Sequence, residues 1–85
     1  MPTQPAHRML RVVNRALMTE LSLPDEPDPD AAFTDLGLDS AGVLVVAGEL
    51  EAELAIEVPV EALFDAPTPR RLATWLATEL DGRRG

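Results

Sequence analysis

Apolar residues recur at helical spacing in three separate stretches of this chain, and no stretch shows the alternation of a β-strand. The stripes predict helices at residues 5–21, 40–54 and 69–80. The residues expected to face the core of these helices are Leu10, Val13, Leu17, Leu21, Val43, Val46, Ala47, Leu50, Leu54, Leu72, Leu76 and Leu80. With only 85 residues, we expect one all-α domain spanning 1–85, with its core at about 6–80 and a flexible tail at 81–85.

A short fourth helix is expected at residues 59–64, because Pro59 can open a single helical turn. The residues expected to be buried there are Val60, Leu63 and Phe64. The fold class is therefore a four-helix bundle with three longer helices and one short one. The prolines and acids of residues 22–39 exclude a helix and predict a long loop. Loops of this length are uncommon in compact domains. The explanation that we expect is that the first two helices lie side by side and the chain must travel back along their length.

Charge is distributed unevenly along the chain. Residues 24–66 hold twelve acids and no base, within a net charge of −8. This block excludes nucleic acid as a partner and favours a basic protein; the alternative is that the acids only keep a small domain soluble. Arg8, Arg11 and Arg15 share one face of the first helix, which indicates either a solvated face or pairing with the acidic block.

Several classes of site and location are disfavoured by what the sequence lacks. It contains no cysteine and a single histidine, His7, so we expect no metal site, and any thiol chemistry would need a thiol from outside the polypeptide. No apolar run has the length of a membrane span, and the first residues lack the pattern of a signal peptide. A cytoplasmic protein with no membrane partner is therefore expected.

The segment Leu36-Gly-Leu-Asp-Ser40 carries the chemistry that we expect. Asp39 is a good helix N-cap, which places Ser40 at the first helical position. The free N–H groups and the positive end of the helix dipole favour a phosphate ester there. No general base lies nearby in the sequence, so Ser40 is expected to be a substrate, and no residue is expected to be catalytic.

This segment resembles the attachment motif of acyl and peptidyl carrier proteins. A second match, Leu63-Phe-Asp-Ala-Pro-Thr68, is similar to the start of the last helix in that family, and the resemblance covers about residues 6–80. It implies that Ser40 carries 4′-phosphopantetheine, which a phosphopantetheinyl transferase moves from coenzyme A, and that its thiol holds a cargo as a thioester. Leu38 and the second motif look most like the discrete carriers of polyketide or nonribosomal peptide biosynthesis.

The resemblance also implies a partner-contact surface, with Asp39 against the transferase and Ala41, Leu44, Val45 and Glu49 in the docking region. Many family members have an acid at the position of Val45 and a large apolar residue at that of Ala41. These departures favour a dedicated partner with a more apolar docking patch, provided that Val45 points outward rather than packing under the short helix. The expected partners are an acyltransferase or adenylating loading enzyme and synthase modules, acting on a monomer.

Two other functions remain open at this point. The cargo could be aminoacyl or peptidyl rather than acyl, because all of these end in the same thioester. The chain could also be a carrier-like adaptor that has kept the bundle and lost the arm. A small helical hydrolase is disfavoured because the sequence offers no base or metal constellation.

Overall fold

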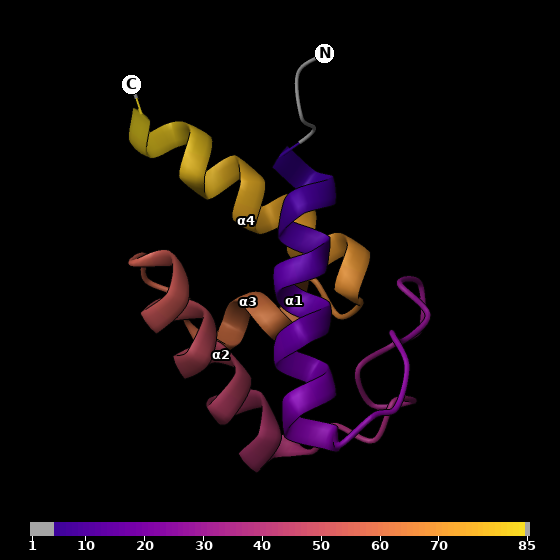
Figure 1. Cartoon of the computed structure of the whole chain (residues 1–85). Helices are drawn as coiled ribbons and strands as arrows, with labels where there is room; N and C mark the ends of the chain where they lie inside the picture. The colour runs from indigo at the N-terminus through magenta and orange to yellow at the C-terminus, as the bar shows by residue number, and fades with distance from the viewer. Residues whose placement is uncertain (1–4, 85) are drawn as a thin grey trace.

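The computed structural model describes residues 5–84, which form four helices and no strand. In chain order these helices are α1 (Pro5–Leu21), α2 (Ser40–Leu54), α3 (Val60–Asp65) and α4 (Pro69–Arg84) (Figure 1). The predicted all-α bundle of three longer helices and one short helix is therefore confirmed. Within these residues no helix is both long and apolar enough to cross a membrane.

One core runs between the four helices, with α1 packed mainly against α4 and α2. The side chains with essentially no exposed surface include Val13, Leu17, Val46, Leu50, Leu72 and Leu76. On α1 the buried stripe is formed by Met9, Val13, Ala16 and Leu17. Leu10 and Leu21, which were expected to face the core, are only half-buried against it.

The bounds of α1 and α2 agree with the predicted ones, whereas α4 does not end at residue 80. It continues to Arg84, so residues 81–84 of the expected tail are helical. Asp81 and Gly82 are exposed, and the helix continues there because no proline stops it. Residue 85 lies outside the described part of the chain.

The reason expected for the long loop is wrong. α1 and α2 run in opposite directions, so the loop leaves and returns at the same end of the bundle (Figure 1). The loop is long because it also covers the junction between α3 and α4. There the Phe33 N–H donates to the Pro67 carbonyl at 2.8 Å, and the Arg70 N–H donates to the Pro29 carbonyl at 2.9 Å. Phe33 itself is buried.

Side chains fasten the same loop at two further points. The Arg70 guanidinium donates from Nε to Asp30 Oδ1 at 2.7 Å and from Nη2 to Asp30 Oδ2 at 3.2 Å. On the other side, Asn14 Nδ2 of α1 donates to Glu26 Oε1 at 2.9 Å. The loop is therefore held to both α1 and α4 before it reaches the start of α2.

Candidate functional site

Ser40 is the first residue of α2, and its side chain is exposed. The preceding residue caps the helix as predicted: Asp39 has extended backbone angles, and its Oδ1 accepts from the Gly42 N–H at 2.8 Å. The Asp39 carbonyl accepts from the Val43 N–H at 2.9 Å. The cap therefore fixes Ser40 at the positive end of the helix, where an attached phosphate is favoured.

A tight turn aims the chain into this helix. Gly37 has a φ of 99°, a backbone conformation that glycine adopts without the steric cost of a Cβ. The Leu38 N–H donates to the Phe33 carbonyl at 3.0 Å, and the Leu38 side chain is buried. The turn thus anchors Leu38 inside while the next two residues face outward.

The role of Gly42, which the sequence left unexplained, follows from this packing. A Cβ at Gly42 would lie 2.7 Å from Leu38 Cδ1, so Gly42 lets α2 begin directly over the Leu38 side chain. At Gly48 a Cβ would have no neighbour within 4 Å, and the structure offers no packing reason for this second glycine.

An apolar cavity of about 290 Å³ lies beside Ser40. It is formed where the loop, the first turns of α2, α3 and the segment before α4 meet. The lining residues are Ala32, Phe33, Thr34, Leu38, Asp39, Ser40, Val43, Leu63, Phe64 and Pro67. A group attached to Ser40 would therefore start at the rim of an apolar hollow rather than on a flat surface.

The expectation that Phe64 is buried is wrong. Its side chain is 63% exposed, whereas its neighbour Leu63 is 2% exposed. In α3 the buried side is formed by Ala62 and Leu63. Phe64 lies about 100° further around the helix and faces outward.

The exposed apolar residues on α2 are close in sequence to Ser40. Leu44 is 63% exposed and Val45 is 43% exposed, so Val45 points outward, and the alternative that it packs under α3 is wrong. Ala41 is exposed and Glu49 is half-buried. The predicted site residues therefore lie together on the first ten positions of α2 and its cap, and Phe64 adds a residue from α3.

A single side chain fixes the approach to α3. Glu51 Oε2 accepts from the Val58 N–H at 2.8 Å. α2 ends at Leu54, and the capping residue that follows it, Ala55, has a φ of 57°. The buried side chains of Ile56 and Val58 then lead the chain to α3. These contacts hold α3 against the cavity beside Ser40.

The ion pair with the clearest effect on charge lies at the loop and α4. The hydrogen bond from Arg70 lowers the pKa of the Asp30 carboxyl below its ordinary value, and the positive charge of Arg70 acts in the same direction. The pKa of the Arg70 guanidinium is raised for the same reasons. None of the residues that line the cavity takes part in this pair.

A bundle of four helices with a capped, exposed serine at the start of α2 defines a class of protein, the helical carrier proteins. The family described as "Phosphopantetheine attachment site" matches residues 11–76. The chain belongs to this family. The cofactor of the family is phosphopantetheine, which a serine carries, and carrier proteins are generally not catalysts.

Relatives and solved structures agree with this assignment. The chain is 41% identical over 59 residues to the mycoketide-CoA synthase of Mycobacterium tuberculosis, which covers 69% of the chain and 1% of that protein. It is 34% identical over 79 residues to the pikromycin polyketide synthase component PikAII of Streptomyces venezuelae, covering 91% of the chain and 2% of that protein. The chain thus spans only a few per cent of the length of these curated relatives.

A solved structure of similar size also matches. The free-standing peptidyl carrier protein from an uncharacterised secondary metabolic pathway of Acinetobacter baumannii is 33% identical, with a TM-score of 0.84. The match covers 92% of this chain and 99% of that one. The chain is therefore a carrier-protein domain, similar both to carrier regions of polyketide synthases and to a carrier that is a separate polypeptide.

Proposed function

We propose that Ser40 is the serine that carries 4′-phosphopantetheine. The sequence has two serines, and the other one, Ser22, follows the end of α1 with a φ of 54°. Ser40 alone stands at the first position of a long helix, beside free N–H groups and an apolar cavity. This position, within the part of the chain that the family matches, is the observation that carries the proposal.

In this function the chain is a single, monomeric, cytoplasmic carrier domain and not an enzyme. A phosphopantetheinyl transferase moves the arm from coenzyme A to Ser40. The Ser40 oxygen forms the new phosphodiester, the pyrophosphate bond of coenzyme A breaks, adenosine 3′,5′-bisphosphate leaves, and a base of the transferase takes the hydroxyl proton. Asp39 contacts the transferase. The thiol at the end of the arm then holds polyketide intermediates as thioesters. A loading acyltransferase and synthase modules bind the carrier in turn, as the similarity to polyketide synthases suggests.

The docking face for these enzymes surrounds Ser40. Its apolar part is formed by Leu44, Val45 and Phe64, all of which are exposed. The buried centres of protein interfaces are more apolar than the rest of the surface, and aromatic side chains such as Phe64 are enriched there. Ala41 leaves space next to Ser40, and Glu49 stands at the edge as a polar contact.

Intact mass measured after incubation with coenzyme A and a broad-specificity phosphopantetheinyl transferase tests the attachment site. The wild-type chain and Ser22→Ala should each gain one phosphopantetheine, and Ser40→Ala should gain none. Modification of Ser40→Ala, or no modification of a folded wild-type chain, would refute the proposal. The second result would favour the adaptor that has lost its arm.

Paired substitutions on α2 test the docking face. Val45→Glu places a charge in the apolar patch, while Ala52→Glu adds the same charge at an exposed position two helical turns further from Ser40. Loading by the native loading enzyme should be slower with Val45→Glu than with Ala52→Glu, and both variants should accept the arm normally. Equal loading rates would remove Val45 from the docking face.

A second candidate is a peptidyl or aminoacyl carrier, favoured by the similarity to the Acinetobacter carrier over nearly the whole length of both chains. The mass of the cargo on protein isolated from its own producer separates the two. An acyl or malonyl group supports the polyketide carrier with its acyltransferase. An aminoacyl group supports the peptidyl carrier, with an adenylating enzyme as the loading partner.

A further inference from the structure

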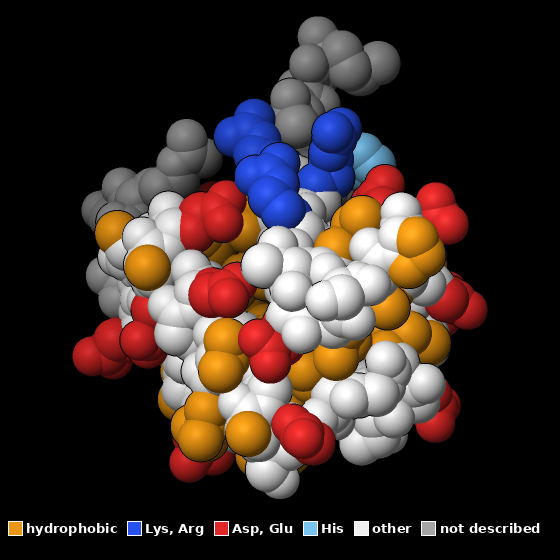
Figure 2. Space-filling model, turned by 60° about the horizontal axis from the view of Figure 1, so that its bottom comes forward, with side chains coloured by type: hydrophobic (Ala, Val, Ile, Leu, Met, Phe, Trp, Pro, Cys, Tyr) orange, Lys and Arg blue, Asp and Glu red, His pale blue; other side chains and the backbone are white. Residues whose placement is uncertain are grey.

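The outer side of α1 carries a cationic stripe that the proposed docking face does not use. Arg8, Arg11 and Arg15 are all exposed, and their spacing of three and four residues places them on one side of the helix. Figure 2 shows cationic side chains gathered at one edge of the face in view, while acidic side chains are scattered over the rest. In a chain with a net charge of −8, this stripe forms a region of opposite sign.

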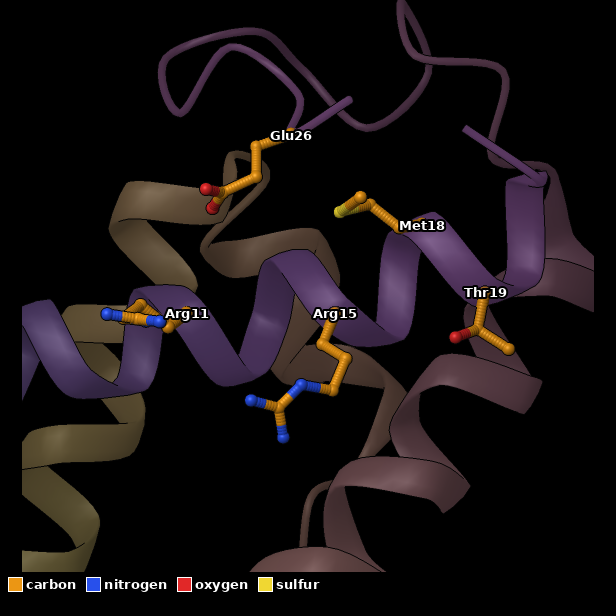
Figure 3. A pocket seen from close by; sticks show the side chains of 5 residues that line it. All are labelled: Arg11, Arg15, Met18, Thr19 and Glu26. Atoms are coloured by element: carbon orange, nitrogen blue, oxygen red, sulfur yellow. The ribbon is translucent and has the colours of Figure 1, made fainter. Parts of the chain in front are cut away.

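Two of these arginines border a hollow of about 440 Å³ between α1 and the long loop (Figure 3). Met18 and Thr19 of α1 and Glu26 of the loop complete its lining. In Figure 3 the side chains of Met18 and Glu26 point into the space between helix and loop, whereas Arg15 points away from the loop. The lining of the hollow therefore combines the apolar side chain of Met18 with two arginines and one carboxylate, and the Arg15 guanidinium stands at its outer edge.

The charged side chains around this hollow differ in whether they have a hydrogen-bond or ion-pair partner within the chain. The Glu26 carboxylate accepts the hydrogen bond from Asn14. Arg15 Nη1 lies 3.6 Å from Glu53 Oε2 of α2, and the two side chains are 68% and 43% exposed. Because water screens the two charges, this ion pair is weak. Within residues 5–84, Arg11 has no carboxylate within salt-bridge distance. Arg11 can therefore bind a carboxylate of another molecule without losing an ion-pair partner. Arg15 can do so by giving up its contact with Glu53.

We propose that this hollow is a second docking site, which takes an acidic helical segment of a partner protein. Two carboxylates of that segment, four residues apart, pair with Arg11 and Arg15, and an apolar side chain about one turn further along the segment enters the hollow beside Met18. Glu26 repels carboxylates from the loop side and so fixes which way the segment lies. A second copy of this chain fits poorly, because two molecules of charge −8 repel each other.

The two docking sites are formed by different residues, and their surroundings carry charges of opposite sign. The hollow on α1 shares no lining residue with the cavity beside Ser40. A carrier held by an acidic segment on α1 can therefore present Ser40 and its docking face to other enzymes at the same time. The acidic block around Ser40 attracts basic surfaces, so each site selects against the other's partner.

Fluorescence anisotropy with a labelled synthetic peptide tests this proposal. The probe is a helical peptide with glutamate pairs four residues apart beside a leucine stripe, and the matched probe has lysine in place of each glutamate. The wild-type chain should bind the acidic peptide and not the basic one at this site, more weakly at high salt because the contact is partly electrostatic. Arg11→Glu should weaken binding roughly fivefold or more.

Arg71→Glu is the matched control, since it makes the same charge change at an exposed position on α4. It should change affinity by less than roughly twofold, because Arg71 lies outside the hollow. Should Arg11→Glu lose helicity by circular dichroism, Arg11→Gln and Arg15→Gln replace it and should each weaken binding. Arm attachment to Ser40 should be unchanged in all of these variants.

Four outcomes would overturn the proposal. The first is that the acidic peptide shows no saturable binding at millimolar concentration, and the second is that Arg71→Glu weakens binding as much as Arg11→Glu does. The third is that the chain prefers the lysine peptide and that this preference depends on Arg11. The fourth is that the chain binds anionic lipid vesicles through Arg11 but does not bind the peptide. The last would assign the stripe to a membrane surface instead.

Discussion

The two glycines of α2 make a matched pair for testing the packing beside Ser40. Replacing glycine by alanine inside a helix stabilises it by up to about 1 kcal/mol, because alanine restricts the unfolded chain and is the best helix former. At Gly48 the new Cβ meets nothing within 4 Å, so this gain should appear in full. Gly48→Ala should therefore raise the free energy of unfolding.

At Gly42 the same substitution meets the Leu38 side chain. The new Cβ would lie 2.7 Å from Leu38 Cδ1 and 3.4 Å from its Cγ. Leu38 is 4% exposed, so it must move within a packed environment, which costs about 1–3 kcal/mol. The net effect of Gly42→Ala should lie between about zero and a loss of 2 kcal/mol, and the two variants should differ by about 1–3 kcal/mol.

Urea unfolding and thermal melting followed by circular dichroism measure this difference. For a domain of this size, each kcal/mol corresponds to about 4–8 °C in Tm, so the gap between the two variants is easy to resolve. Leu38 lines the cavity beside Ser40, so Gly42→Ala should also slow arm attachment, and Gly48→Ala should leave it unchanged. A Gly42→Ala variant as stable as Gly48→Ala would refute the account of how α2 begins over Leu38.

Three further predictions test other parts of the structure. Asp39→Ala removes the cap of α2 and should cost about 1 kcal/mol in urea unfolding, with Asp39→Ser restoring most of it; no loss would mean that the cap does not stabilise the helix. Asp30→Asn should lower Tm slightly at neutral pH, because Arg70 depresses the folded-state pKa of Asp30. The stability that this ion pair contributes is present above the unfolded-state pKa of 3.8 and is lost as the pH falls through the lowered folded-state pKa. The difference in Tm between Asp30→Asn and the wild type should therefore become smaller by about pH 2. A difference in Tm that does not change with pH would contradict this. Leu63→Ala should cost about 2–5 kcal/mol and Phe64→Ala no more than about 0.5 kcal/mol, and similar losses would contradict the exposed position of Phe64.

The elements that the sequence predicted well depend on local rules. The start of α2 follows from the capping chemistry of Asp39, and the N-cap hydrogen bond from the Arg71 N–H to Thr68 Oγ1, at 3.1 Å, marks the start of α4 in the same way. The fold class follows from the helical spacing of the apolar residues, whereas the docking residues around Ser40 came from the resemblance to carrier proteins. These rules need only residues within a turn or two of each other.

The features that the sequence did not predict depend on contacts between distant residues. Nothing local indicates that the loop is fixed to α4 through Asp30 and Arg70, which lie forty positions apart. The direction of α2 relative to α1 is likewise a property of the packed bundle. The outward position of Phe64 likewise depends on which side of α3 faces the bundle, and that side is formed by Ala62 and Leu63.

The contacts around Ser40 suggest how one small domain could fit several enzymes. Three elements meet there, and each has a polar contact near the site: Asp39 with the Gly42 N–H, Glu51 with the Val58 N–H, and the Phe33 N–H with the Pro67 carbonyl. Such a hydrogen bond contributes about 1 kcal/mol. α2 also buries Val43, Val46, Ala47 and Leu50, whereas the shorter α3 buries Ala62 and Leu63, so apolar burial holds α2 more firmly than α3. We therefore expect α3 to adjust to each partner while α2 keeps Ser40 fixed. Hydrogen exchange of the Val58 amide that is as slow as that of the core amides of α2 would contradict this division.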